Sequence, residues 1–285
     1  MGACGMNIGT IIQARTGSTR LPGKVLLTLP YDSDITVLSQ VVRRVKRSEL
    51  SGKIIIATTK KREDDRIIEI AKQEGVDSFR GDEEDVLSRY WEAAKFFSLD
   101  IIVRVTSDCP CIDWQAIDRV VDAIIQGHAD YVRIKGNHPL GTEDVEAFTF
   151  KALDIAYKNS NQNFEREHVT PYICYTAPQD FKIFWLKSFS TSDIKIRVVL
   201  DTIEDYALLC IIYDELYWKK NFFSTTDIIS FLQQKPWLNL INSRILQKKI
   251  FSSLKEEIHE AIKLLKLQDL KRAALFLERN FFGRE

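Results

Sequence analysis

The chain has 285 residues, of which 45% are hydrophobic, and its 40 basic side chains balance 40 acidic ones. This length exceeds the usual size of a single-core domain and favours one large α/β domain with an appendage. A formal net charge of zero excludes a global field that would attract nucleic acid or an anionic membrane. We therefore expect neither as a partner, and we expect phosphate to be bound only locally.

The cysteines and the apolar runs indicate a reduced, cytoplasmic protein. The five cysteines are an odd set, and no signal-peptide pattern precedes the first apolar run. Cys109 and Cys111 lack a second Cys/His pair at ligand spacing, which favours ordinary buried thiols over a zinc site. No apolar stretch approaches the roughly 20 residues that span a bilayer, so we expect a soluble protein.

The first half of the chain alternates strands and helices. A β-branched run at residues 7–14 predicts a buried strand that ends in a loop rich in Gly, Pro and Arg. Helical spacing of Val and Leu follows from Asp34. Further strands are expected at 53–59, 78–81 and 100–106, and further helices at 62–75, 82–97 and after Asp113. This order predicts a doubly wound, mostly parallel sheet that binds ligands beyond the carboxyl ends of its strands.

After residue 129 the pattern becomes mixed. Strands or extended runs are expected at 129–134, 144–150, 182–187 and 194–200, and helices at 150–159 and 203–217. Beyond about residue 243 the chain is rich in Leu, Lys and Glu, with helical periodicity and no catalytic residue types. We therefore predict a domain at 1–242 and a helical extension at 243–285 that could form an oligomer contact.

Three cations follow the first predicted strand. Arg15, Arg20 and Lys24 are separated by small residues and Pro, which let a backbone approach an anion. Arg binds phosphate oxygens in a bidentate way and Lys adds a point charge. From spacing alone, a solvated basic loop is an equally good interpretation. The loop is not a P-loop, because Lys24 is followed by Val25.

The loop also carries a family resemblance. IIQARTGSTRLPGKVL, at residues 11–26, resembles the amino-terminal signature of the CMP-sugar synthetases, in particular their spore-coat polysaccharide protein F-like branch. It is also similar to acylneuraminate and 3-deoxy-manno-octulosonate cytidylyltransferases. Agreement continues in order to about residue 242, through FRGDEEDVLSRYWEAAK, VRVTSDCPCID, EDVEAF, EREHVTPYI and VVLDTIEDY.

This resemblance implies a glycosyltransferase-A-like α/β fold with a mixed β/α sugar-binding region. It implies a reaction in which a hydroxyl of an acidic, nonulosonate-like sugar attacks the α-phosphate of CTP and releases pyrophosphate, for surface polysaccharide biosynthesis. Arg15 and Lys24 would hold the triphosphate, helped by Ser18 and Arg20. The implied nucleotide-binding set is Gln13, Ala14, Arg15, Ser18, Arg20, Lys24, Arg80, Thr106 and Ser107.

Two aspartates are candidate metal ligands. Asp108 follows a predicted strand and Asp201 lies between a predicted strand and a helix. Taken alone, Asp108 could be a turn residue, and Asp201 or Thr202 a helix cap. The resemblance implies that both aspartates bind a catalytic Mg²⁺, which typically takes one or two carboxylates. Because parallel strands end at one rim of the sheet, we expect the two to meet and to act with Lys24 and Arg15 in catalysis.

Base recognition is less sharply defined. By the resemblance, Arg80 contacts the cytosine or its ribose, although an ion pair with the acidic run at 82–85 is nearly as good an interpretation. Thr106 stands where some relatives have a Gln that contacts the base. Preference for CTP over UTP is therefore less certain than the type of reaction.

The sugar is expected to contact the second half of the chain. Glu143, Asp144 and Glu146 lie in an extended run, in which Asp144 and Glu146 would share one face and bind hydroxyls. Arg166 or His168 could bind a sugar carboxylate. A salt-bridged Arg and a hydrogen-bonded His are an equally good interpretation.

Other functions and the assembly state remain open from the sequence. A sugar-1-phosphate nucleotidyltransferase would usually have a first loop richer in Gly. A nucleotide-binding relative without turnover need not keep both carboxylates, which argues against it. Relatives of the resembling family are commonly dimers, so a homodimer is expected by analogy.

Overall fold

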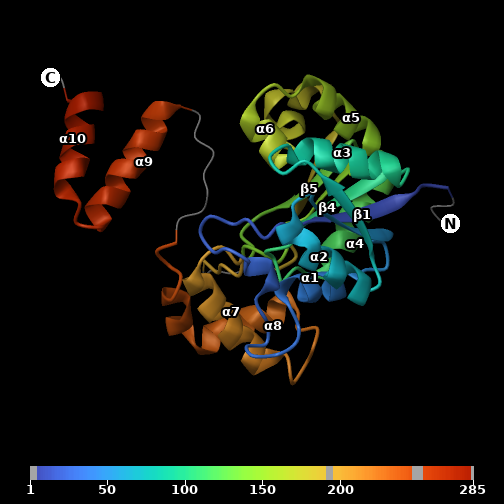
Figure 1. Ribbon diagram of the computed structural model, residues 1–285, viewed down its shortest axis with the longest axis horizontal. Helices are drawn as coiled ribbons and strands as arrows, with labels where there is room; N and C mark the ends of the chain where they lie inside the picture. Colours follow the sequence, from blue (N-terminus) through green and yellow to red (C-terminus); the bar gives the residue numbers. More distant parts are fainter. Residues whose placement is uncertain (1–4, 191–194, 246–252, 284–285) are drawn as a thin grey trace. The chain divides into compact units, whose positions relative to one another are not determined.

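A computed structural model describes residues 5–190, 195–245 and 253–283. The chain divides into two compact units, residues 1–245 and 246–285. The first unit is built around one seven-stranded sheet with the strand order β3-β2-β1-β4-β6-β5-β7 (Figure 1). The strands are β1 Ile8–Gln13, β2 Lys53–Thr59, β3 Asp77–Gly81, β4 Ile101–Thr106, β5 Tyr131–Lys135, β6 Glu146–Thr149 and β7 Ile183–Lys187.

The sheet is mostly parallel, as expected, but mixed on one side. Strands β1 to β4 are parallel, whereas β6 is antiparallel to both of its neighbours, β4 and β5. Strand β7 is parallel to β5. Because β6 reverses direction between them, β4 and β5 run the same way, and their carboxyl ends lie at the rim where β1 also ends.

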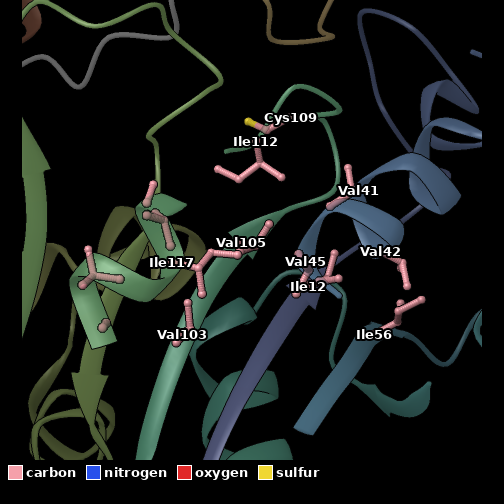
Figure 2. Packing of buried hydrophobic residues seen from close by; sticks show 14 of the residues in the cluster. Ile12, Val41, Val42, Val45, Ile56, Val103, Val105, Cys109, Ile112 and Ile117 are labelled. Carbon is pink, nitrogen blue, oxygen red and sulfur yellow. The ribbon is translucent and has the colours of Figure 1, made fainter. Parts of the chain in front are cut away.

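Helices cover both faces of this sheet (Figure 1). In the first unit they are α1 Val37–Val45, α2 Asp65–Gln73, α3 Val86–Phe96, α4 Trp114–Gly127, α5 Phe150–Asn159, α6 Asn163–His168, α7 Ile203–Leu216 and α8 Thr225–Gln234. One core cluster packs α1, α2 and α4 against the sheet, and a second packs α3 and α5 against the opposite face. Figure 2 shows the first cluster, with Val41 and Val45 of α1 over Ile12 of β1, and Ile117 of α4 beside Val103 and Val105 of β4.

Helix starts follow polar caps in the sequence. The side chains of Thr36, Asp113, Thr149 and Thr202 each accept a backbone N–H in the first turn of the helix that follows. The helix expected from residue 82 begins later, at Val86, because Asp85 is its cap and Asp82 accepts the N–H groups of residues 84 and 85. The acidic run thus forms a turn beside the rim.

The prediction of a strand at 194–200 is wrong over the described residues 195–200. That segment forms only an isolated bridge, between Leu140 and Arg197. Its alternating residues Ile196, Val198 and Leu200 are buried against α7 and α8 in a third core cluster. Period-two burial here comes from packing on helices, so the pattern resembles a strand without belonging to the sheet.

In the second unit, the described residues 253–283 form α9 Leu254–Leu267 and α10 Lys271–Phe281, which pack on each other. Their small core contains Ile258, Ile262 and Ala274. Among the described residues, no helix is both long and apolar enough to cross a membrane.

Candidate active site

Lys24 lies at the centre of a polar cluster on the rim. Its Nζ atom donates to Asp108 Oδ2 at 2.8 Å, Asp201 Oδ1 at 2.9 Å and the carbonyl of Leu200 at 2.7 Å. Arg20 adds a fourth group, with Nη2 3.1 Å from Asp201 Oδ1. Both aspartates expected to meet therefore do meet, at an ammonium group.

Neighbouring opposite charges favour the ionised forms of Lys24 and Asp201. Burial by itself would lower the pKa of Lys24, but Asp108 and Asp201 outweigh it and raise that pKa above its ordinary value. Burial would also raise the pKa of Asp201, but Lys24, Arg197 and Arg20 hold it below its ordinary value. Both shifts favour the charged forms of Lys24 and Asp201.

Local backbone geometry brings Lys24, Asp108 and Asp201 together. Gly23 adopts a left-handed conformation, φ 71°, before the 3₁₀ turn Lys24–Leu26. Asp108 lies in the turn after β4, which is anchored by the buried Cys109 and Ile112 (Figure 2). The N–H of Leu200 donates to the carbonyl of Asp108 at 2.8 Å, so the two aspartate segments are joined through their backbones. Asp201 meets Asp108 through this contact and not, as expected, at the end of a strand.

Arg197 binds the carboxylate oxygen of Asp201 that does not contact Lys24. The sequence did not lead us to predict this residue as part of the site. Its Nη2 donates to Asp201 Oδ2 at 2.6 Å, and its Nε donates to Asp205 Oδ1 at 3.0 Å. Thr202, not Asp201, caps α7, with Asp205 completing the capping box. Asp201 is thus left to face Lys24. The signal was available, because Arg197 is a charge inside the otherwise apolar run 196–200.

Arg15 lies apart from Lys24, beside a cavity of about 520 Å³. The cavity is lined by Arg15, Asp82, Glu83, Glu84, Asp85, Val86, Asn163, Arg166 and Glu167. Arg15 is 3.9 Å from Glu83, and Glu83 also binds Lys61 at 2.6 Å. The predicted catalytic cations are therefore divided between the aspartate pair and this cavity.

The structure gives Arg80 other partners than the acidic run at 82–85. Its Nη1 donates to the carbonyls of Thr59 at 2.9 Å and Lys61 at 3.1 Å, and its Nη2 binds Asp65. The expected ion pair is replaced by contacts that hold the loop after β2. The contact of Arg80 with a base stays a prediction.

The other expected nucleotide contacts lie where β1 and β4 end. Gln13 is the last residue of β1, and its carbonyl accepts the N–H of Ser107 at 3.2 Å. Ala14 is buried, and its N–H donates to the carbonyl of Ala57 at 3.1 Å. Thr106 ends β4 with its hydroxyl 3.3 Å from Cys109 Sγ, and Ser18 Oγ accepts the N–H of Leu21 at 3.4 Å.

The acidic residues expected to contact sugar have internal partners. Glu143 accepts from Ser188 Oγ at 3.1 Å and from the N–H of Ser190 at 3.2 Å. Asp144 precedes β6, binds the N–H of Gly141 and lies 3.7 Å from His138. Glu146 begins β6 and binds two arginines. Asp144 thus lies just before β6 and Glu146 is its first residue, and binding of sugar hydroxyls by these residues stays a prediction.

Arg166 also has internal partners. Its Nε donates to Asp85 at 2.7 Å, and its Nη1 donates to the carbonyls of Tyr157 and Ser160. This geometry fits the salt-bridged interpretation of Arg166. His168 is the last residue of α6. Sugar binding by either residue stays a prediction.

Comparisons with known proteins identify the family of this chain. A family model described as Cytidylyltransferase matches residues 10–213. An uncharacterized protein of Methanocaldococcus jannaschii is 44% identical over 248 residues, covering 85% of this chain and 97% of that protein. The spore coat polysaccharide biosynthesis protein SpsF of Bacillus subtilis is 32% identical, covering 79% and 94%. A 3-deoxy-manno-octulosonate cytidylyltransferase of Geobacter sulfurreducens is 32% identical, covering 44% and 48%.

Solved structures similar to this chain include another cytidylyltransferase. A cytidylyltransferase from Leptospira borgpetersenii superposes with a TM-score of 0.76 at 35% identity, covering 85% of this chain and 99% of that one. CMP:2-keto-3-deoxy-manno-octonic acid synthetase, solved with CTP, superposes with a TM-score of 0.58 at 14% identity, covering 74% and 100%, and supports the fold alone. The α/β fold expected from the sequence is confirmed. The chain belongs to the cytidylyltransferase family.

Proposed function

We propose that this protein is a CMP-sugar synthetase. It transfers CMP from CTP to a hydroxyl of an acidic, nonulosonate-like sugar, releases pyrophosphate and serves surface polysaccharide biosynthesis in the cytoplasm. The observation that carries the proposal is the meeting of Lys24, Asp108 and Asp201 at the sheet rim of a cytidylyltransferase.

The residues fit a magnesium ion. One carboxylate oxygen of Asp108 and one of Asp201 converge on a single cationic atom, at 2.8 and 2.9 Å. Mg²⁺ typically takes one or two carboxylates together with phosphate oxygens and water. Asp108 and Asp201 would hold it, and it would offset the charge that develops on the α-phosphate during transfer.

The cations of the first loop hold the triphosphate. Arg20 lies beside the aspartate pair and Arg15 beside the cavity, so a chain of phosphates can extend between them. Lys24 contributes its ammonium to a phosphate oxygen. The nucleotide-binding role is completed by Gln13, Ala14, Ser18, Arg80, Thr106 and Ser107.

Transfer requires positioning more than acid–base chemistry. The acceptor oxygen forms a bond to the α-phosphorus while the bond to the bridging oxygen of pyrophosphate breaks. Most of the acceleration comes from alignment and from fixed charges around the phosphate. We propose that the sugar contacts Glu143, Asp144, Glu146, Arg166 and His168. Residues 1–242 are proposed as the catalytic domain and residues 243–285 as a helical extension. The protein is proposed to be a homodimer.

A pyrophosphate-release assay tests the proposal. CTP, UTP and other nucleotides are each combined with Mg²⁺ and a panel of acidic sugars or sugar 1-phosphates. We expect release with CTP and an acidic sugar only. Release with a sugar 1-phosphate would instead identify a sugar-1-phosphate nucleotidyltransferase, and nucleotide binding without release under any combination would identify a non-catalytic relative.

Variants of the two aspartates sharpen the assay. Asp108→Asn and Asp201→Asn should each remove most turnover without unfolding the protein, and the double variant should be scarcely worse, because residues that act as one unit are not additive. Strictly additive losses, or full activity in EDTA, would contradict the assigned pair.

A further inference from the structure

Three charged side chains lie in register across the sheet. Glu146 of β6 pairs with Arg104 of β4 on one side and with Arg133 of β5 on the other. Residues directly opposite each other on neighbouring strands project from the same face. Tyr131, two residues before Arg133, belongs to the core cluster packed against α3 and α5, so the three charges share that face.

This charged row has more positive than negative charge. Glu146 is only 5% exposed, and its carboxylate accepts from Arg104 Nη1 and Arg133 Nη1, each at 3.2 Å, and from Tyr131 Oη at 3.1 Å. Burial would raise the pKa of Glu146, but the two guanidinium groups outweigh it and keep the carboxyl ionised. One carboxylate thus faces two cations. Asp144 also acts on Arg133, but it binds the N–H of Gly141 and lies beside His138.

Arg133 is the more accessible of the two arginines in the row. The Arg133 side chain is 33% exposed, although it is surrounded by sheet. Lys135, two residues further along the same face of β5, is exposed and lies 3.4 Å from the centroid of the Trp185 ring. Trp185 of β7 is in register with Arg133, is partly exposed and meets Tyr131 edge-on.

The row is close to the transfer site. Arg104 precedes Asp108 by four positions and lies two residues before the end of β4, which corresponds to roughly 7 Å along a strand. Its Nε donates to Gln13 Oε1 at 3.2 Å, which joins the row to the end of β1. Arg133 is level with Arg104 but two strand spacings away, roughly 10 Å, so a sugar acid held at Arg133 has to extend across β6 to bring a hydroxyl to the rim.

We propose that Arg133, aligned by Glu146 and Arg104, binds the acidic group of the acceptor, and that Trp185 packs against the sugar. A guanidinium matches a carboxylate in a bidentate way, and an indole offers a large apolar surface for the C–H face of a sugar. The inference rests on the proposed function and names the groups that select an acidic acceptor. This narrows the sugar contact proposed above for Glu146 to an indirect one, since Glu146 is then a positioning residue that acts through Arg133.

A pair of acceptors tests the proposal. Pyrophosphate release is measured at saturating CTP and Mg²⁺ with 3-deoxy-manno-octulosonate and with its C1 amide, which lacks the charge. For Arg133→Gln we expect the KM for the acid to rise tenfold or more, while kcat and the KM for CTP change less than about threefold. The preference for the acid over the amide should fall toward one, and Arg133→Lys should restore part of it.

Arg43→Gln is the matched control. Arg43 of α1 binds a single carboxylate, Glu74, at 3.0 Å and is 38% exposed, close to the value for Arg133. It should leave both acceptors unaffected, and thermal unfolding should show that both Gln variants are folded. Equal losses for acid and amide in Arg133→Gln, or a raised KM for CTP, would overturn the proposal. A wild-type protein that uses neither acid nor amide but accepts a sugar 1-phosphate would overturn the proposed function itself, before any variant is made.

Discussion

The Lys24 ammonium occupies the point at which the oxygens of Asp108 and Asp201 converge. A divalent cation bound by the same two oxygens would need that point. Lys24 and the proposed metal ion would therefore compete, and Lys24 would have to turn from the carboxylates toward phosphate for both to act. Sequence reasoning assigned Lys24 to phosphate alone, because spacing along a loop does not show which anion a flexible side chain meets without substrate.

This competition predicts tighter metal binding when the ammonium is removed. In the nucleotide-free protein, Lys24→Met should bind Mn²⁺ about tenfold more tightly than wild type, since a close positive charge no longer repels the ion. Titration calorimetry measures the affinity. Lys61→Met is the control, because Lys61 binds Glu83 and not the aspartate pair. Equal affinity in wild type and Lys24→Met would show that Lys24 does not exclude the ion.

The depressed pKa of Asp201 predicts a pH-dependent stability. A carboxyl whose folded pKa lies below its unfolded value, about 3.9, stabilises the protein above that value and loses the contribution as pH falls through the folded pKa. Asp201→Asn should therefore be less stable than wild type near neutral pH, and the difference should shrink below about pH 4. Urea unfolding at several pH values measures it. Asp180→Asn, at an exposed position, should show no such trend.

Two residues of the charged row could have been noticed in the sequence. Arg104 is a lone charge in β4, and Arg133 is a charge between the apolar residues Val132 and Ile134 of β5, a pattern typical of a buried ion pair or a binding site. Their common partner could not be predicted, because Glu146 lies in a strand whose register and direction depend on tertiary pairing. Glu146 was therefore expected to face the sugar.

At the scale of elements, periodicity predicted most helices and strands of the first half. It failed at residues 195–200, where buried alternation reflects packing on α7 and α8. That segment carries Arg197, which binds Asp201 and Asp205 at once. Although this segment has an irregular backbone and is not a strand of the sheet, it brings Arg197 and Asp201 to the site.

The Arg197 contact predicts a large loss of stability when it is broken. The Asp205 side chain is 0% exposed, and Arg197→Met leaves its charge without a cationic partner. Removing one partner of a buried ion pair costs about 3–5 kcal/mol, and the remaining N–H donors to Asp205 favour the lower end. Urea unfolding measures the change. Arg43→Met, which breaks a half-exposed pair, should cost less than about 1 kcal/mol, and a similarly small loss in Arg197→Met would contradict the role of the contact.

At the scale of the whole molecule, β-α alternation was enough to predict a doubly wound sheet, because a parallel strand needs a crossover that packs on a face. The order β4-β6-β5-β7 was beyond that reasoning. A short strand such as β6 can be inserted antiparallel without any change in its own pattern. For the same reason, the sequence could not predict which charged residues are opposite each other on neighbouring strands.

The boundary between the two units can be tested by truncation. Asn242 is buried, and its Nδ2 donates to the carbonyl of Arg197 at 3.0 Å and to Asp205 Oδ1 at 2.9 Å, so it belongs to the network behind Asp201. A chain of residues 1–245 keeps these bonds and contains the region matched by the family model. It should unfold at the temperature of the full chain and release pyrophosphate within about twofold of its rate.

Truncation after residue 241 should behave differently, because it removes Asn242 and leaves the buried carbonyl of Arg197 without its donor, at a cost of roughly 1–3 kcal/mol. Asp205 Oδ1 also loses one donor but keeps its bond from Arg197 Nε. We expect a lower unfolding temperature and a weaker response to Mg²⁺ in the assay, since Asp201 is less firmly held. Light scattering on the 1–245 chain tests whether α9 and α10 support the proposed homodimer. Loss of turnover in the 1–245 chain at unchanged unfolding temperature would mean that these helices contribute to catalysis, which no contact within the first unit predicts.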